Sequence, residues 1–476
     1  MSLRERVETG MITTVLKMLP RMSEKNLIRA TYLVEKLPQD EGIRKAIRIV
    51  REYFKKGHPS VKLAKRIWGE LHPNCLNKLV ENFFINACFI SDKIRKEIKE
   101  KEGFHIPWFF VISPTMKCNL RCRGCSVESY KKDKDLPKEV WDRILDEAQS
   151  LGIYFITVQG GETFIRPDML DIYASHPDMY FQVYSNGTLI DKKMAKRLQE
   201  LGNVEVNLSV EGFEKETDLR RGKGVWRKVM EAMDNLREAG VMFGFSVTQT
   251  RLNTDIITSD EFFKLMIEKG CYIGWFFHYI PLGKDPDLGL VPLPSQRNKL
   301  REKLKEVRET PPLFVGDFWN DGPFVQGCIA GARQYCHINH RGEVEPCAFC
   351  HFAVDNINNG KSLKEIFNSP FFREMREKIQ WEEASSPYSD NLLTPCQIID
   401  QPWVLRELVE KYNAYSTDGA GDVLLKGKAA KFLDEYSRQI HALYDRIWEE
   451  DSYYKKIREG VREKRRKLFA TIVKNK

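Results

Sequence analysis

The feature that constrains the fold most is a regular alternation of strands and helices in the middle of the chain. Six apolar segments of strand length alternate with amphipathic segments of helical period. The strands are expected near residues 106–113, 153–158, 179–184, 203–210, 242–250 and 272–279, and the helices near 137–151, 166–175, 191–201, 224–240 and 258–269. Strands joined by helical crossovers pair in parallel. We therefore predict an α/β fold built on a partial (β/α)6 barrel, with ligands gathered at the carboxyl ends of the strands.

The segments on either side of this core differ from it in composition. The first hundred residues carry two amphipathic helical stripes, separated by Pro73, that either pack on the barrel or meet lipid. Proline-rich and cysteine-rich segments follow the barrel, and helical periodicity then returns. We predict five units: an N-terminal helical, membrane-associating domain (1–103), the barrel (104–285), a linker with a helix (286–312), a small auxiliary iron–sulfur domain (313–400) and C-terminal helices with a basic tail (401–476).

The formal net charge of +9 over 476 residues resides mainly in the tail. Ser452–Lys476 contains ten Lys and Arg residues against two Glu, so the rest of the chain is nearly neutral. The chain has no run of about 18 apolar residues and no signal-peptide layout. We therefore expect a cytoplasmic protein with no nucleic-acid partner, peripheral on the inner face of the cytoplasmic membrane, whose tail binds the anionic membrane surface. The alternative is that the tail is a solvated helix face.

Three cysteines follow the first predicted strand at once. Cys118, Cys122 and Cys125 lie within Met116–Ser126, and in a reducing compartment this spacing favours metal ligation over disulfides. Three thiolates can bind one [4Fe-4S] cluster and leave one iron open to a small molecule. A structural zinc would recruit a fourth ligand nearby, and the sequence offers none. The neighbouring lysine and arginines suit an anionic cluster better than an apolar core.

The Cys-x3-Cys-x2-Cys loop at the opening of a partial barrel resembles the radical S-adenosylmethionine (SAM) superfamily over roughly residues 104–285. The resemblance implies that the open iron binds SAM and that the reduced cluster cleaves SAM to methionine and a 5′-deoxyadenosyl radical, which abstracts hydrogen. It also implies an electron donor such as flavodoxin or ferredoxin. The cofactor supplies the difficult chemistry and the barrel supplies position and dryness. No catalytic side chain of the protein itself is predicted.

Later strand ends carry motifs similar to those of the superfamily. They are Gly160-Gly161-Glu162 after the second strand, Ser185-Asn186 in the turn after the third, Ser209 and Glu211 after the fourth, and Arg221 in Asp218-x2-Arg221-Gly222. The resemblance implies that Glu162 binds the methionine ammonium, that Ser209 and Glu211 contact the ribose, and that Arg221 contacts the SAM carboxylate. For each polar residue taken singly, a turn or helix cap is the alternative.

Two positions depart from the superfamily pattern. Gly124 stands where an aromatic residue near the adenine usually precedes the third cysteine, and Thr163 stands where proline often follows Gly-Gly-Glu. Neither change removes a ligand. The adenine must then be packed by another side chain, and Tyr130 or residues of the sixth strand are the candidates.

A second cysteine set follows the barrel. Cys328, Gly342 and Cys347 have the spacing Cys-x13-Gly-x4-Cys, which resembles the auxiliary-cluster domain called SPASM or twitch. A hairpin around Gly342 would bring the two cysteines together. We expect Cys328, Cys347 and Cys396 to bind an auxiliary [4Fe-4S] cluster, with Cys350 as a weaker fourth ligand.

The fourth ligand of this auxiliary cluster stays open. Cys350, His351, the substrate or no group at all could occupy that position, although a lone histidine is usually structural. Cys336 alternates with other inward residues on a predicted strand and is expected to be packing only.

The whole chain, including Gly316–Asn320 and Glu345–Cys347, resembles a group of anaerobe proteins associated with bacterial membrane-spanning lipid synthesis and functionally related to tetraether synthases. The resemblance implies a phospholipid substrate whose two acyl tails are joined by a carbon–carbon bond. Aromatic runs at Trp108–Phe110 and Trp275–Tyr279 suit such an apolar substrate.

Two other functions compete with lipid synthesis. The first is a peptide or protein maturase, against which the first hundred residues show no evident winged-helix module for a precursor peptide. The second is an iron–sulfur electron carrier at a membrane surface, which would not need Gly160–Glu162 or Arg221. The sequence does not predict the oligomeric state.

Overall fold

The computed structural model describes residues 24–36, 41–283, 285–379 and 390–474, and its core is the predicted barrel. Seven parallel strands form it in sequence order, and the six predicted strands are all present. They are β1 (Phe109–Ile112), β2 (Phe155–Val158), β3 (Tyr180–Ser185), β4 (Val204–Val210), β5 (Phe243–Gln249), β6 (Ile273–His278) and β7 (Phe314–Asp317). Each strand except β6, in which buried and half-buried residues alternate, presents mostly buried residues, as expected for a sheet covered on both faces.

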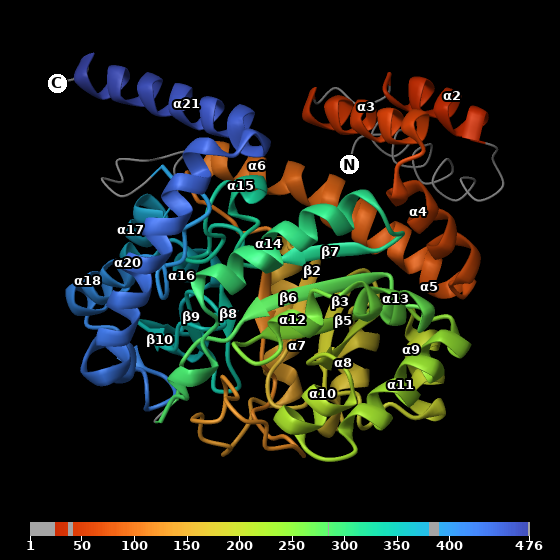
Figure 1. Ribbon diagram of the computed structural model, residues 1–476, viewed down its shortest axis with the longest axis horizontal. Coiled ribbons are helices and arrows are strands. Elements are labelled where there is room, and N and C mark those ends of the chain that lie inside the picture. Colours follow the sequence, from red (N-terminus) through yellow and green to blue (C-terminus); the bar gives the residue numbers. More distant parts are fainter. Residues whose placement is uncertain (1–23, 37–40, 284, 380–389, 475–476) are drawn as a thin grey trace.

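Helices connect the strands on the outside of the barrel (Figure 1). The connections are α7 (Lys138–Ser150), η3 (Thr163–Ile165) with α8 (Met169–Ser175), α9 (Lys192–Leu201), α10 (Glu214–Arg221) with α11 (Val225–Ala239), α12 (Thr254–Ile257) with α13 (Asp260–Glu268), and η4 (Leu288–Leu290) with α14 (Pro294–Glu309). Side-chain caps fix several starts: Asp191 accepts from the Met194 amide at 2.7 Å at the start of α9.

The sheet continues past the predicted barrel boundary at residue 285. On one edge β7 pairs with β6, and on the other β8 (His337–Ile338) pairs in parallel with β1. The predicted hairpin is confirmed, because β8 pairs antiparallel with β9 (Glu343–Glu345) around Gly342, whose φ is 84°. The small domain is therefore attached to the barrel by backbone hydrogen bonds.

The N-terminal helices, apart from the first two of them, lie across the amino-terminal end of the barrel (Figure 1). They are α2 (Glu24–Val34), α3 (Glu41–Lys56), α4 (Pro59–Glu70), α5 (Pro73–Lys78), the π-helical segment η2 (Leu79–Ile90) and α6 (Ser91–Glu102). Leu79 and Ala87 pack with Phe155 and Tyr180 of the barrel, and the ring of Phe83 lies 5.4 Å from that of Phe155. The second predicted stripe thus packs on the barrel, which was the simpler of the two expectations.

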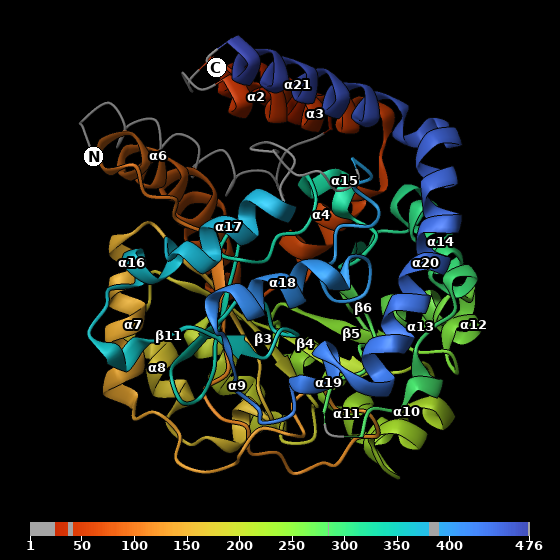
Figure 2. The same ribbon diagram turned by 90° about the vertical axis from the view of Figure 1, so that its left-hand side faces the viewer.

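The rest of the chain covers the open side of the barrel (Figure 2). Its further elements are α15 (Gly322–Val325), β10 (Phe352–Ala353), β11 (Asp355–Asn356), η5 (Ile357–Asn359), α16 (Leu363–Phe367), α17 (Pro370–Ile379), α18 (Pro402–Tyr412), β12 (Tyr415–Ser416), α19 (Asp422–Leu425), α20 (Gly427–Glu450), η6 (Ser452–Tyr454) and α21 (Lys455–Lys474). Arg297 of α14 and Asp400 before α18 form a fully buried ion pair at 2.5 Å. Among the described helices, none is long and apolar enough to cross a bilayer.

Candidate functional site

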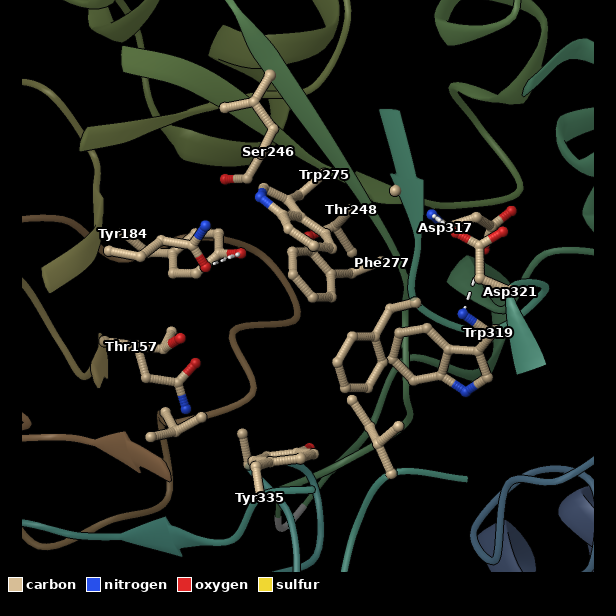
Figure 3. Close-up of a pocket in the computed structure, with 18 of the residues that line it drawn as sticks. Thr157, Tyr184, Ser246, Thr248, Trp275, Phe277, Asp317, Trp319, Asp321 and Tyr335 are labelled. Atoms are coloured by element: carbon tan, nitrogen blue, oxygen red, sulfur yellow. Dashed lines mark hydrogen bonds between the residues drawn. The ribbon is translucent and has the colours of Figure 1, made fainter. Parts of the chain in front are cut away.

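One cavity of about 1580 Å³ runs through the barrel and reaches both cysteine sets. Its wall includes all three cysteines after β1, and also Cys328, Cys347 and Cys396 of the small domain. At its other end the wall is formed by N-terminal helices, through Leu63 of α4 and Phe83 of η2. Figure 3 shows its middle section, where strand side chains converge from several directions. Six of the seven sequence-predicted cluster ligands therefore line one cavity, and Cys350 does not.

The first cysteine loop presents its thiols to this cavity. Cys118 Sγ accepts a hydrogen bond from the Leu120 amide at 3.4 Å and lies 3.8 Å from Nδ2 of Asn186. Burial raises the pKa of the Cys122 thiol, and the guanidinium of Arg221 opposes that shift. A metal cluster would take up the thiolate forms. Three partly exposed thiols, aided by amide donors and a nearby cation, fit the three-cysteine ligation of an anionic iron–sulfur cluster.

The end of β2 lies directly against the cysteine loop. The Gly161 amide donates to the Thr115 carbonyl at 2.9 Å, and the Glu162 amide donates to the Lys117 carbonyl at 2.8 Å. A Cβ on Gly160 would lie 2.3 Å from the Thr115 carbonyl oxygen, and one on Gly161 would lie 2.1 Å from that of Lys117. Any side chain at either position would push the cysteine loop away, so both glycines are required by backbone packing alone.

Glu162 is buried and faces the end of β3. Its carboxylate accepts hydrogen bonds from the Asn186 amide at 2.7 Å, from Ser185 Oγ at 2.9 Å and from the Phe164 amide at 3.2 Å. Its side chain does not line the cavity, whereas Ser185 and Asn186 do. Glu162 thus links the ends of β2 and β3 by hydrogen bonds. Its contact with the methionine ammonium stays a prediction.

Two arginines share the carboxylate of Glu211. Its Oε1 accepts from Arg220 at 2.5 Å and from Arg221 at 2.7 Å, and its Oε2 has no partner among the described residues. Both arginines line the cavity and Glu211 does not. Arg220 is a residue that the sequence motif missed, although it precedes Arg221 directly. Ser209 also lines the cavity, with its Oγ 3.4 Å from that of Ser246.

Tyr279, directly after β6, occupies the space beside Gly124. A Cβ on Gly124 would lie 2.6 Å from the Tyr279 ring, and the glycine has a φ of 67°. Tyr279 lines the cavity, and its hydroxyl has no partner among the described side chains. Tyr130, the other candidate to pack the adenine, donates instead to Glu345 at 2.7 Å and does not line the cavity. Of the two candidates, the sixth-strand residue is the one that lies beside Gly124 on the cavity wall, and its contact with the adenine stays a prediction.

The second cysteine set is more deeply buried than the first. Cys347 and Cys350 face each other in an isolated antiparallel bridge, and burial raises the pKa of Cys347 to about 12. Amides donate to sulfur at 3.3 Å from Phe349 to Cys347 and at 3.4 Å from Ile398 to Cys396, as is usual around cluster thiolates. Cys350 is fully buried and does not line the cavity. Its part in ligation stays a prediction.

The imidazole of His351 is fixed by contacts with two neighbouring side chains. Its Nδ1 lies 2.8 Å from Asp418, its ring packs on that of Tyr130, and its Nε2 has no described partner. Cys336 is completely buried, in agreement with a packing role. The described residues contain no group of three His, Cys, Asp or Glu side chains arranged around a single metal ion. A cubane cluster has no need of such a group, since each thiolate binds a separate iron.

Comparisons with known proteins agree with this geometry. Residues 112–257 match the family model of the radical SAM superfamily, and residues 328–397 match that of the SPASM iron–sulfur cluster-binding domain. The mycofactocin maturase MftC of Mycobacterium tuberculosis is 29% identical over 296 residues, spanning 58% of this chain and 74% of the maturase. An AdoMet-dependent heme synthase of Oleidesulfovibrio alaskensis is 24% identical over 302 residues, spanning 56% and 76% of the two chains.

Among solved structures, Streptococcus suis SuiB bound to its precursor peptide SuiA superposes with a TM-score of 0.53 at 16% identity, covering 74% of this chain and 85% of SuiB. SuiB bound to S-adenosylmethionine gives a TM-score of 0.51 at 18% identity, covering 64% and 74%. At these identities the likeness concerns the fold alone.

Fold, cysteine sets and family matches together define a radical SAM enzyme that carries an auxiliary SPASM domain. Its cofactors are [4Fe-4S] clusters and SAM, as the sequence predicted, and when bound they supply a 5′-deoxyadenosyl radical. The relatives named above are maturases and heme synthases, so the resemblance of the whole chain to lipid synthases gains no support from them.

We predict that the iron content of single variants distinguishes the cysteines that bind the auxiliary cluster from those that only pack. Cys328→Ala or Cys347→Ala should remove about half of the iron of the reconstituted protein, because one of two cubane clusters loses its ligands. Cys336→Ala is the matched control and should keep the full content. Iron and sulfide analysis with electron paramagnetic resonance measures the loss. Full iron in both ligand variants would contradict the assignment, and Cys350→Ala tests the fourth ligand in the same way.

We also predict that the Tyr279 ring contributes to SAM binding. Tyr279→Ala should raise the dissociation constant of SAM by about tenfold, because an aromatic face beside the cysteine loop is lost. Tyr279→Phe should bind SAM as the native enzyme does, since it keeps the aromatic ring and the hydroxyl has no side-chain partner among the described residues. Equilibrium binding to the cluster-loaded protein measures both, and an unchanged affinity in Tyr279→Ala would show that the adenine is packed elsewhere.

Proposed function

We propose that this enzyme abstracts hydrogen from unactivated carbons of lipid acyl tails and joins two tails by a carbon–carbon bond. The observation that carries the proposal is the cavity, which is large, mostly apolar in its lining, and continuous from the N-terminal helices to both cysteine sets. Apolar cavities of this kind bind chains by burial without directional bonds. A dry wall also protects a carbon radical from side reactions.

Aromatic rings form much of the wall near the small domain. Phe277 lies 5.4 Å from Phe318 between ring centroids, and Trp319 lies 5.2 Å from Phe349. These contacts link β6, the segment after β7 and the second cysteine set. An acyl tail packed on them would lie between the two sets of cluster ligands.

The stoichiometry of tail coupling requires two radical events. Joining two tails breaks two C–H bonds and forms one C–C bond, so two hydrogen atoms leave. Each is carried away as 5′-deoxyadenosine, and each SAM cleavage takes one electron from a donor such as flavodoxin or ferredoxin. The cavity volume of about 1580 Å³ lies above the usual range for a single small ligand, and it has to receive SAM and the clusters at the cysteine sets as well as the substrate.

A peptide maturase is the second candidate function, and the comparisons favour it. MftC is a maturase by name, and the fold superposes on SuiB with its precursor peptide bound. The described residues between Glu24 and Glu102 form helices without the strands of a winged helix.

We predict a chemical product that separates the two candidates. Expression in an anaerobic host that makes only ordinary diacyl lipids should yield long dicarboxylic acids after lipid hydrolysis, measured by mass spectrometry. Cys118→Ala is the control and should yield none, because it lacks a cluster ligand. If the cluster-loaded enzyme forms 5′-deoxyadenosine from SAM but no dicarboxylic acid accumulates, the lipid proposal is wrong and the maturase becomes the better candidate.

We also propose that the basic α21 helix contacts an anionic membrane. The structure refines which part can do so, because Tyr454 and Val461 are buried and Arg462 bonds Asp390 at 2.9 Å. Deleting the whole tail would therefore damage the core, while the exposed bases of α21 can be substituted without removing these contacts.

We predict that Lys455→Gln, Lys456→Gln and Arg466→Gln together weaken binding to phosphatidylglycerol vesicles at least about tenfold at moderate salt, since each charge near the surface contributes about 1 kcal/mol. Vesicle sedimentation of the full chain measures the affinity. The matched control carries the same substitutions at Lys426, Lys428 and Lys431, at the opposite end of α20 (Figure 2). Equal binding by both variants would reduce α21 to a solvated helix face.

A further inference from the structure

The barrel interior has two chemically different walls. Strands β2 to β5 present polar side chains to the cavity, among them Thr157, Tyr184 and Ser246, whereas β6 and the segment after β7 present Trp275 and Trp319 (Figure 3). An alkyl chain alone would gain nothing from the polar wall, because buried polar groups cost free energy unless they are hydrogen-bonded. The polar wall therefore requires an explanation of its own.

The centre of the polar wall is a pair of side chains on neighbouring strands. Gln182 of β3 and Glu205 of β4 are register partners, and both line the cavity. Gln182 Nε2 donates to Glu205 Oε1 at 3.0 Å, and Asn207 Nδ2 donates to the same oxygen at 3.0 Å. Glu205 is only 5% exposed. Both described hydrogen bonds engage the same carboxyl oxygen, which leaves Oε2 for another partner.

The surroundings of Glu205 are uncharged. Burial raises its pKa, and the two amides oppose the shift, with no basic side chain contributing. A carboxyl group in such a place favours its neutral form and can then donate a hydrogen bond from its second oxygen. The capacity of this group of side chains is therefore for a neutral ligand with hydrogen-bonding atoms.

We infer that Gln182 and Glu205 form a subsite for an uncharged carbonyl group of the substrate, an ester or an amide, at a distance from the reacting carbon. Gln182 precedes Ser185 by three residues, so the subsite lies roughly 10 Å along β3 from the strand end beside the cysteine loop. The ring centroids of Tyr184 and Phe277 lie 5.7 Å apart across the barrel, and the two rings narrow the cavity between the subsite and that strand end. A bound carbonyl would fix which carbon of a long substrate reaches that strand end.

The subsite does not depend on the choice between lipid and peptide. An acyl ester offers only acceptor atoms, while a peptide amide offers an N–H donor as well, which Gln182 Oε1 can accept with its second lone pair beside the bond from the Tyr184 hydroxyl at 3.5 Å. The same experiment can therefore test the subsite and identify the source of its ligand.

The test is the binding of simple probes to the full-length, cluster-loaded enzyme. Methyl decanoate, decanamide and decane are titrated by calorimetry against the native protein and Glu205→Leu. The native protein should bind the two carbonyl compounds more tightly than decane. Glu205→Leu should bind the carbonyl compounds about tenfold more weakly than the native protein does, as expected for the loss of one or two hydrogen bonds. The affinity for decane should not fall. Equal loss for all three probes, or no loss for any, would overturn the subsite.

Two further variants keep the test decisive. Glu205→Leu leaves two amides without an acceptor, so Glu205→Gln, which keeps a neutral hydrogen-bonding group, should bind the carbonyl probes within about threefold of the native protein. Thr248→Val, on the same wall at β5, is the matched control and should bind all probes normally. Melting temperature and iron content confirm that each variant is folded and loaded.

The outcome also distinguishes the two candidate substrates. Preference for decanamide over methyl decanoate would point to a peptide, and equal binding would point to an acyl ester. If decylamine bound more tightly than the other probes and Glu205→Gln no longer bound it, the Glu205 carboxylate would bind a cation and the inference would be wrong. Failure of the dicarboxylic acid experiment alone would reject lipid coupling and leave the subsite untouched.

Discussion

The close contact between the end of β2 and the cysteine loop is the constraint on which the rest of the site depends. With no side chain at Gly160 or Gly161, two backbone segments hydrogen-bond directly, and the loop is fixed over the barrel mouth. Glu162 then reaches the end of β3, and Asn186 returns to Cys118 at 3.8 Å. Three strand ends are thus locked to one another by backbone contact and a buried carboxylate. A pre-organised site of this kind can hold a cluster and its ligand without reorganising during the reaction.

The cavity owes its shape to two closures that involve distant parts of the chain. At the amino-terminal end, aromatic side chains of η2 pack on Phe155 and Tyr180 and cover the barrel. At the open side, β8 extends the sheet beside β1, and the buried Arg297–Asp400 pair joins α14 to the segment before α18. A buried ion pair is costly to break but adds little net stability over an apolar contact, so this one is better understood as fixing the position of the small domain. That position places Cys328 and Cys396 on the wall of the cavity.

The period of the sequence predicted the barrel, because buried parallel strands separated by amphipathic helices leave a strong local pattern. The residues predicted to bind the first cluster came from short glycine and cysteine motifs, which are also local in the sequence. Contacts between distant segments could not be predicted from local sequence patterns. No such pattern indicates that Tyr279 lies over Gly124 or that Tyr130 turns toward Glu345. β7 was missed because its apolar run, Leu313–Val315, lies between a Pro311-Pro312 pair and Gly316 and is shorter than those of the predicted strands. A signal for the polar wall did exist, since Val204–Val210 alternates polar and apolar residues although both faces are buried.

The two walls of the barrel bear directly on selectivity. Each buried methylene of an alkyl chain contributes about 0.8 kcal/mol, but it contributes nearly the same amount wherever the chain stops along an apolar wall. An aromatic cavity by itself therefore gives affinity without choosing a carbon. A hydrogen bond has a fixed origin, and a shift of one carbon would leave both the ligand and the Glu205 carboxyl unpaired at a cost of about 1–3 kcal/mol. A radical can attack any C–H bond within reach, so an enzyme that makes one product needs such a fixed point. In this chain Gln182 and Glu205 are buried, uncharged in their surroundings and on the cavity wall, which are the properties that such a fixed point requires.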